Sequence, residues 1–121
     1  MNNLPILDVV FFLTASGNSP VRDWLRSLSV EDRKVIGEDL KLTQFRWPVG
    51  MPLVRKLEPG LWEVRSQLKH GGIARVLFTV QRHDMVLLHG FEKKSKKIPK
   101  DDLELARNRM RQYKEADNEQ T

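Results

Sequence analysis

Three apolar runs, the first with an alternating pattern, are joined by very short connections and restrict the fold of this chain more than any other feature. The runs cover residues 61–68, 73–80 and 85–91. Alternation of apolar and polar residues, as in the first run, is typical of a strand with one buried face. The two connections are too short for a crossover, so consecutive strands must pair antiparallel. The pattern predicts a three-stranded antiparallel meander.

Helix signals lie on both sides of the meander. Ser19 can cap a helix that begins at Pro20, and Ser29 can cap a second helix that runs to about Arg46. After Pro99, apolar side chains recur at helical spacing behind two acidic residues, which favour the positive end of a helix dipole. We therefore expect two helices before the meander and one after it.

The N-terminal residues 6–13 are rich in branched and aromatic side chains, which favours a further strand. Together these elements predict an α+β fold: a small antiparallel sheet, made of the N-terminal strand and the meander, packed with two N-terminal helices and a C-terminal helix. A chain of 121 residues suits one domain, spanning 1–121. Its polar end, 115–121, is expected to fray.

Charge and cysteine content narrow the classes of partner and cofactor. A net charge of +5 and a pI near 9.7 favour polyanionic partners, because lysine and arginine release counterions from phosphates. The chain has no cysteine, so zinc would have to rely on His70, His83, His89 and carboxylates. We expect neither a metal nor a cofactor. The absence of a membrane-length apolar run and of a secretory signal predicts a cytoplasmic protein without membrane contact.

Two arginines occupy interior positions of neighbouring predicted strands. Arg65 lies in the first strand of the meander and Arg75 in the second. Burial of an unpaired charge is costly, so each guanidinium needs a partner. One interpretation is an ion pair with Glu63 or Glu92. The other is a rigid cradle for a phosphate, which requires a strand register that brings both arginines to one face.

A basic segment follows the third strand of the meander. It holds four lysines within five residues: Lys93, Lys94, Lys96 and Lys97. Such a run is often a solvated loop before a helix. The alternative is a contact with an RNA backbone, with one lysine close enough to transfer a proton. His89 precedes this run on the face expected for Leu87 and Phe91, which favours a core histidine over an RNA contact or a general base.

Three ordered segments resemble one protein family. They are residues 56–65 (KLEPGLWEVR), 72–78 (GIARVLF) and 87–94 (LLHGFEKK). Together they are similar to the phage-derived Gp49-like branch of the HigB toxins, within the RelE/ParE toxin superfamily. The helices before and after them fall where that family has helices. The resemblance implies a curved antiparallel sheet flanked by helices, and a toxin that cuts messenger RNA at the ribosomal A site.

The resemblance also implies roles for individual residues. Arg65 and Arg75 match strand arginines that hold the scissile phosphate and stabilise its extra charge in the transition state. Lys93 and Lys94 match a lysine pair that follows an aromatic residue. In such enzymes a ribose 2′-hydroxyl attacks the adjacent phosphate, so the reaction requires proton transfer and positive charge but no metal.

Two departures from the family pattern affect the expected site. After the lysine pair, relatives often have glutamine and threonine, whereas this chain adds Lys96 and Lys97 to the expected RNA contact. The better-studied relatives use a tyrosine or a histidine near the C-terminus. Tyr113 is the aromatic residue available there, but its place on the apolar stripe of the last helix favours a core role. The general base is therefore left open.

The resulting functional hypothesis is a toxin of a type II toxin–antitoxin system that acts as a ribosome-dependent mRNA endonuclease. Its expected partners are the ribosome, messenger RNA and an inhibitory helix-turn-helix antitoxin similar to HigA. Two alternatives remain open. One is a ParE-like toxin that inhibits gyrase without cutting RNA. The other is a non-catalytic module that binds RNA or a protein, since a fold does not determine a function.

Overall fold

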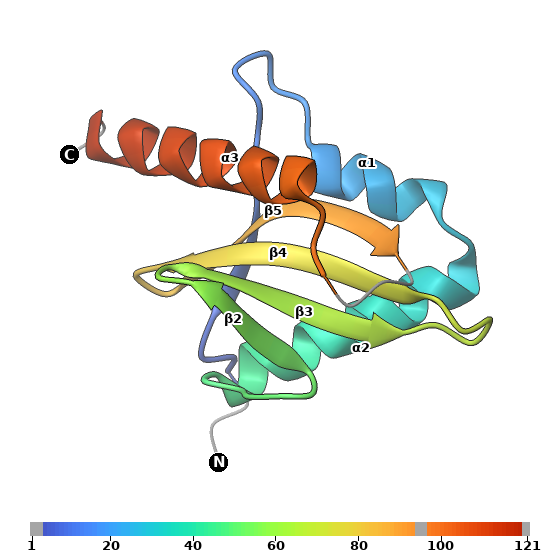
Figure 1. The fold of residues 1–121 in the computed structure, drawn as a ribbon. Coiled ribbons are helices and arrows are strands. Elements are labelled where there is room, and N and C mark those ends of the chain that lie inside the picture. Colours follow the sequence, from blue (N-terminus) through green and yellow to red (C-terminus); the bar gives the residue numbers. More distant parts are fainter. Residues whose placement is uncertain (1–3, 94–96, 120–121) are drawn as a thin grey trace.

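The structure, a computed structural model, describes residues 4–93 and 97–119, which form five strands and three helices (Figure 1). The helices are α1 (Pro20–Ser27), α2 (Val30–Arg46) and α3 (Lys100–Glu119). The strands are β1 (Asp8–Phe11), β2 (Val54–Glu58), β3 (Leu61–Gln67), β4 (Ile73–Gln81) and β5 (Asp84–Lys93). They make one sheet in the order β1-β5-β4-β3-β2.

The predicted α+β class and the meander are confirmed. β3, β4 and β5 are consecutive antiparallel neighbours, and the N-terminal strand belongs to the same sheet. Two details differ from the expectation. β1 runs parallel to β5, which the long stretch of chain between them permits, and β2 adds an edge strand antiparallel to β3. The sheet is therefore mixed and not wholly antiparallel.

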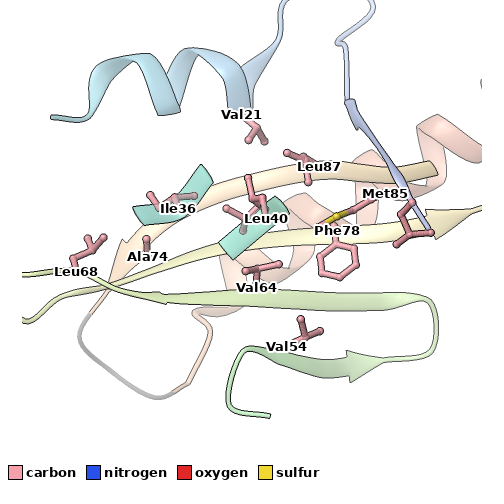
Figure 2. Packing of buried hydrophobic residues seen from close by; sticks show 12 residues of the cluster. Val21, Ile36, Leu40, Val54, Val64, Leu68, Ala74, Phe78, Met85 and Leu87 are labelled. Atoms are coloured by element: carbon pink, nitrogen blue, oxygen red, sulfur yellow. The ribbon is translucent and has the colours of Figure 1, made fainter. Parts of the chain in front are cut away.

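One face of the sheet packs against α1 and α2 (Figure 2). Val21 of α1 and Ile36 and Leu40 of α2 contribute to a buried cluster that includes Val64 and Phe78 from the sheet. Full burial of a side chain of this size stabilises the fold by about 1.5–3 kcal/mol. This cluster is the larger of the two apolar cores among the described residues.

The opposite face of the sheet packs against α3, which crosses it above β4 and β5 (Figure 1). Ala106 of α3 is fully buried in a second cluster with Leu77 and Leu88. The contacts of α3 with the sheet run from His89, near the first turn of the helix, to Gln81, near its last turn. The end of β5 therefore extends beyond the start of α3.

A bulge in β5 changes which side chains share this second face. Leu77 pairs with His89, but the next residue of β4, Phe78, pairs with Leu87, so Leu88 is an extra residue in β5. Leu87 consequently packs toward α1 and α2, whereas His89 lies on the α3 side with Phe91. The expectation that His89 shares a face with Leu87 was wrong, because the extra residue interrupts the period of two.

The helix boundaries agree closely with the capping signals. The hydroxyl of Ser29 accepts a hydrogen bond from the backbone amide of Asp32 at 3.1 Å, as expected of an N-cap. α1 begins at Pro20 as predicted, but the Ser19 side chain makes no capping hydrogen bond. No helix in the described ranges has both the length and the apolar character required to cross a membrane.

Candidate functional site

β3 and β4 place two arginines directly opposite each other. Arg65 pairs with Arg75 in the antiparallel register, so both lie on the face that carries Leu77 and α3. The strand register that the sequence left open thus brings the two guanidinium groups together. Like charges opposite each other destabilise a sheet unless a counter-charge lies between them.

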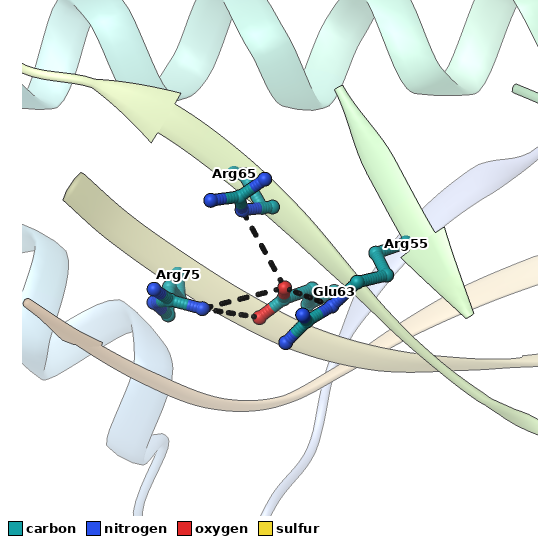
Figure 3. Close-up of polar contacts among 4 residues, drawn as sticks. All are labelled: Arg55, Glu63, Arg65 and Arg75. Atoms are coloured by element: carbon teal, nitrogen blue, oxygen red, sulfur yellow. Dashed lines mark hydrogen bonds and ion pairs between the residues drawn. The ribbon is translucent and has the colours of Figure 1, made fainter. Parts of the chain in front are cut away.

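Glu63 supplies that counter-charge, as Figure 3 shows. Its Oε1 atom lies 2.9 Å from Nε of Arg55 and 3.6 Å from Nε of Arg65. Nη1 of Arg75 donates to both carboxylate oxygens, at 3.4 and 3.3 Å. The expected ion pair with Glu63 is therefore present, and a third arginine, Arg55 of β2, joins it. We call Arg55, Glu63, Arg65 and Arg75 the arginine cluster.

Burial and charge in the arginine cluster are both unusual. The side chains of Glu63 and Arg75 are 0% exposed, whereas those of Arg65 and Arg55 are 20% and 33% exposed. Arginine stays protonated in proteins, so three guanidinium groups around one carboxylate give these four residues a net charge of +2. The cluster is thus a buried ion network with excess positive charge and two partly open arginines. The two partly open guanidinium groups can donate to an anion such as a phosphate.

A histidine and a carboxylate form a second polar pair on the same face. Nε2 of His89 lies 2.6 Å from Oδ1 of Asp102, in the first turn of α3. The His89 ring also stacks on Phe91, with centroids 5.3 Å apart. Its side chain is 16% exposed, so His89 lies at the border of the core, and a contact with RNA stays a prediction. The Asp102 carboxylate fixes the orientation of the imidazole ring through Nε2, so Nδ1 is the ring nitrogen that does not face this carboxylate.

The basic segment is only partly within the described residues. Lys93 is the last residue of β5, and its side chain is exposed. It pairs in register with Ile73, which precedes Arg75 by two residues in β4. Lys97 is exposed and lines a groove of about 350 Å³ together with Arg55 and Lys56 of β2. The remaining two predicted contacts, Lys94 and Lys96, lie outside the described residues. The lysines that can be placed therefore border the arginine cluster.

A cavity opens beside the arginine cluster. It has a volume of about 420 Å³ and is lined by Arg65 and Gln67 of β3, by Asp39 of α2 and by the apolar side chains of Val35 and Leu53, among others. Apolar walls with a few polar groups are typical of ligand sites. The partly open guanidinium of Arg65 contributes to the wall of this cavity.

Tyr113 has the core role that the apolar stripe predicts. It is half-buried and packs against the cluster beneath α3. Burial raises the pKa of the Tyr113 phenol, and the negative charges of Asp84 and Asp117 raise it further. A raised pKa makes the phenol harder to deprotonate, so Tyr113 is poorly suited to be a base near neutral pH.

Two residues of this site escaped the sequence reasoning. Arg55 lies in β2, a five-residue strand between two prolines, and its sequence, VRKLE, shows no alternation that would have predicted a strand. Asp102 was noted only for its favourable place in the first turn of a helix. Its contact with His89 depends on how α3 is set on the sheet, which local patterns do not reveal.

Comparison with known proteins identifies the family. The chain matches the family described as phage derived protein Gp49-like (DUF891) over residues 23–111. A search of curated proteins found no match. The matched region contains the arginine cluster, His89, Asp102 and Lys93, and it covers more than half of the chain. The family is associated with the toxins of toxin–antitoxin systems. This chain therefore belongs to the phage-derived Gp49-like protein family.

Proposed function

We propose that this protein is a toxin that cuts messenger RNA on the ribosome and thereby stops translation. The observation that carries this proposal is the arginine cluster, with its net charge of +2 and two partly open guanidinium groups. Membership of a family associated with toxin–antitoxin systems supports it. The ParE-like alternative, inhibition of gyrase, does not require this phosphate-binding arrangement.

The chemistry needs positive charge and proton transfer. The ribose 2′-oxygen forms a bond to the adjacent phosphorus as the bond between phosphorus and the 5′-oxygen breaks. The 2′-hydroxyl loses a proton and the departing 5′-oxygen gains one, which leaves a 2′,3′-cyclic phosphate and a 5′-hydroxyl. A group that stabilises the extra negative charge on the phosphoryl oxygens lowers the barrier.

The arginines divide this work according to their exposure. Arg65 and Arg55 are partly open and are the groups that reach a phosphate. Arg75 is fully buried, so in this proposal it acts as a positioning residue that holds Glu63. This differs from the direct phosphate contact that the family resemblance implies for Arg75. Glu63 lies 3.6 Å from Nε of Arg65, so its charge attracts the inner side of that guanidinium, and the outer nitrogens face the phosphate in this proposal.

Proton transfer falls to residues on the same face. His89 is oriented by Asp102 and occupies the strand row next to that of Arg75 and Phe91. Through Nδ1 it can accept the proton of the 2′-hydroxyl. Lys93 and Lys97 border the arginine cluster and contact the RNA backbone, and Lys94 and Lys96 extend that contact. No step in this scheme requires a metal.

The inhibitory partner is expected to cover the same face. Toxin-family membership suggests an antitoxin, and we propose a helix-turn-helix protein similar to HigA. A toxin whose arginines and lysines are covered cannot reach RNA. An acidic surface on that antitoxin would complement the chain's net charge of +5.

The decisive experiment is induced expression of the wild type beside the Arg65→Ala variant, with mRNA 5′ ends mapped on ribosomes. New 5′ ends inside translated codons, together with growth arrest, are expected for the wild type only. Arg111→Ala is the matched control, because it removes the same charge from an exposed position on α3.

Other outcomes would contradict the proposal. Growth arrest with intact messenger RNA and damaged DNA would indicate the gyrase inhibitor. RNA binding without cleavage or arrest would indicate a non-catalytic module. Equal loss of cleavage in the Arg65→Ala and Arg111→Ala variants would show that total charge matters and that the arginine cluster does not.

A further inference from the structure

A second convergence of polar groups lies on the other face of the sheet. Glu92 follows Phe91 in β5, so the two side chains lie on opposite faces of the sheet. Glu92 pairs in register with Ala74, which packs toward α1 and α2. Its carboxylate meets Asp32, in the first turn of α2, and His70, in the connection between β3 and β4. Three separate segments thus bring one imidazole and two carboxylates together, away from the arginine cluster.

The distances among these groups are longer than the optimum for a hydrogen bond. Nε2 of His70 lies 3.4 Å from Oδ2 of Asp32 and 3.4 Å from Oε1 of Glu92. An N–H···O hydrogen bond has its optimum at about 2.9 Å, and one imidazole N–H cannot point at two carboxylates at once. Both contacts are therefore longer than this optimum, and they compete for the same nitrogen.

The same distances suit ligands arranged around a metal ion. Zinc forms bonds of about 2.0–2.2 Å to imidazole nitrogen and carboxylate oxygen, and a tetrahedral arrangement then sets neighbouring ligand atoms about 3.4 Å apart. The ligand atoms of Asp32, His70 and Glu92 all lie within 4.8 Å of one another. Three protein ligands leave a fourth position for water.

The backbone next to these groups keeps the space they need. A Cβ atom on Gly72 would lie 3.0 Å from Cε1 of His70 and 3.1 Å from Cδ of Glu92. Glycine thus allows both side chains to approach each other. An ion pair of 2.7 Å between Lys69 and Glu31 also ties the β3–β4 connection to the start of α2.

We infer that Asp32, His70 and Glu92 form a binding site for a divalent transition metal, with zinc as the best fit. An imidazole ligand favours zinc, nickel or copper over magnesium and calcium, which prefer sites made of oxygen atoms. Bound metal would fasten the β3–β4 connection and the end of β5 to α2. This inference does not depend on the proposed RNA cleavage, because its ligands lie on the other face of the sheet.

The test is a calorimetric titration of the full chain, purified without a histidine tag, with zinc chloride. We expect one zinc ion per chain and a zinc-dependent rise in the thermal midpoint, because the metal binds the folded state. His70→Ala should lower the affinity at least tenfold. The matched control is His83→Ala, which removes an exposed histidine from the β4–β5 turn and should leave the affinity unchanged.

Two further variants separate metal binding from folding. Glu92→Gln keeps the shape of an exposed side chain and should also weaken zinc, while Gly72→Ala should weaken it without removing a ligand. Magnesium chloride should give no binding at this site. The inference is overturned if the wild type binds no zinc, if His70→Ala and His83→Ala bind it equally, or if magnesium binds as well as zinc.

Discussion

His89 and Asp102 connect the end of β5 to the first turn of α3 through a contact of 2.6 Å between Nε2 and Oδ1. The contact joins residues 13 positions apart and lies on the same face as the arginine cluster. A carboxylate on one imidazole nitrogen holds the ring and selects the tautomer, which frees the other nitrogen to exchange a proton. The pair thus supplies what the arginines lack, a group able to move a proton.

The first prediction concerns this pair. His89→Gln should lower kcat for RNA cleavage by about 100-fold with little change in KM, because it removes proton transfer and not binding. Asp102→Asn should lower kcat less, since His89 remains but loses its orientation. The measurement is single-turnover cleavage on ribosomes, with thermal midpoints recorded in parallel. A change confined to KM, or a loss of kcat that follows a loss of folding, would contradict the role.

The second prediction tests the charge balance of the arginine cluster. Glu63→Gln removes the carboxylate that Arg55, Arg65 and Arg75 share and should cost about 3 kcal/mol of unfolding free energy, because Arg75 stays buried. Arg55→Ala removes a partly exposed partner and should cost clearly less. Urea unfolding at neutral pH measures both. Equal costs would show that burial of Arg75 does not depend on Glu63.

Much of the fold was predictable because it depends on contacts close in sequence. Ser29 caps α2 through an amide three residues away, and Pro20 starts α1 with a backbone angle that its own ring sets. The meander follows from alternating apolar residues and short turns. These signals act within a few residues, so they can be read before any tertiary contact is known.

The parts that were not predictable depend on distant contacts. The extra residue Leu88 in β5 leaves no local signature, yet it decides the face of His89. The ion pair between Arg55 and Glu63 forms only because β2 lies beside β3 at the edge of the sheet. The contact between Asp102 and His89 forms only because α3 packs across β5 in this orientation. The sequence thus offered Glu63 as a partner of the two arginines, while the places of Arg55 and Asp102 became evident only from the strand order and the packing of α3.

The third prediction concerns acid stability. Arg107 donates to both carboxylate oxygens of Glu58, at 2.8 and 2.7 Å, and these hydrogen bonds hold the pKa of Glu58 below its ordinary value of 4.5. A lowered folded-state pKa contributes stability above pH 4.5 that is lost as the pH falls through the folded value. The difference in unfolding free energy between wild type and Arg107→Ala should therefore narrow in acid.

Urea unfolding at neutral pH and at several acidic values measures that difference. Arg111→Ala serves as the control, because Arg111 donates a hydrogen bond of 2.8 Å to the neutral side chain of Asn108, and the difference between this variant and wild type should not change with pH. A difference for Arg107→Ala that stays constant, or widens in acid, would show that the Glu58 pair does not link stability to pH.

The last prediction uses two glycines that differ in their surroundings. A Cβ atom on Gly90 of β5 would overlap Cε3 and Cζ3 of the Trp24 ring, so the α1 helix can approach the sheet only where this side chain is missing. Gly90→Ala should therefore destabilise the fold by about 1–3 kcal/mol, as overpacking does.

Gly37→Ala is the matched control: Gly37 lies inside α2 with no atom within 4 Å of the added carbon. It should stabilise the protein by about 0.5–1 kcal/mol, because alanine favours the helix. Thermal or urea unfolding distinguishes the two, and a neutral Gly90→Ala would mean that α1 can shift away from the sheet at little cost.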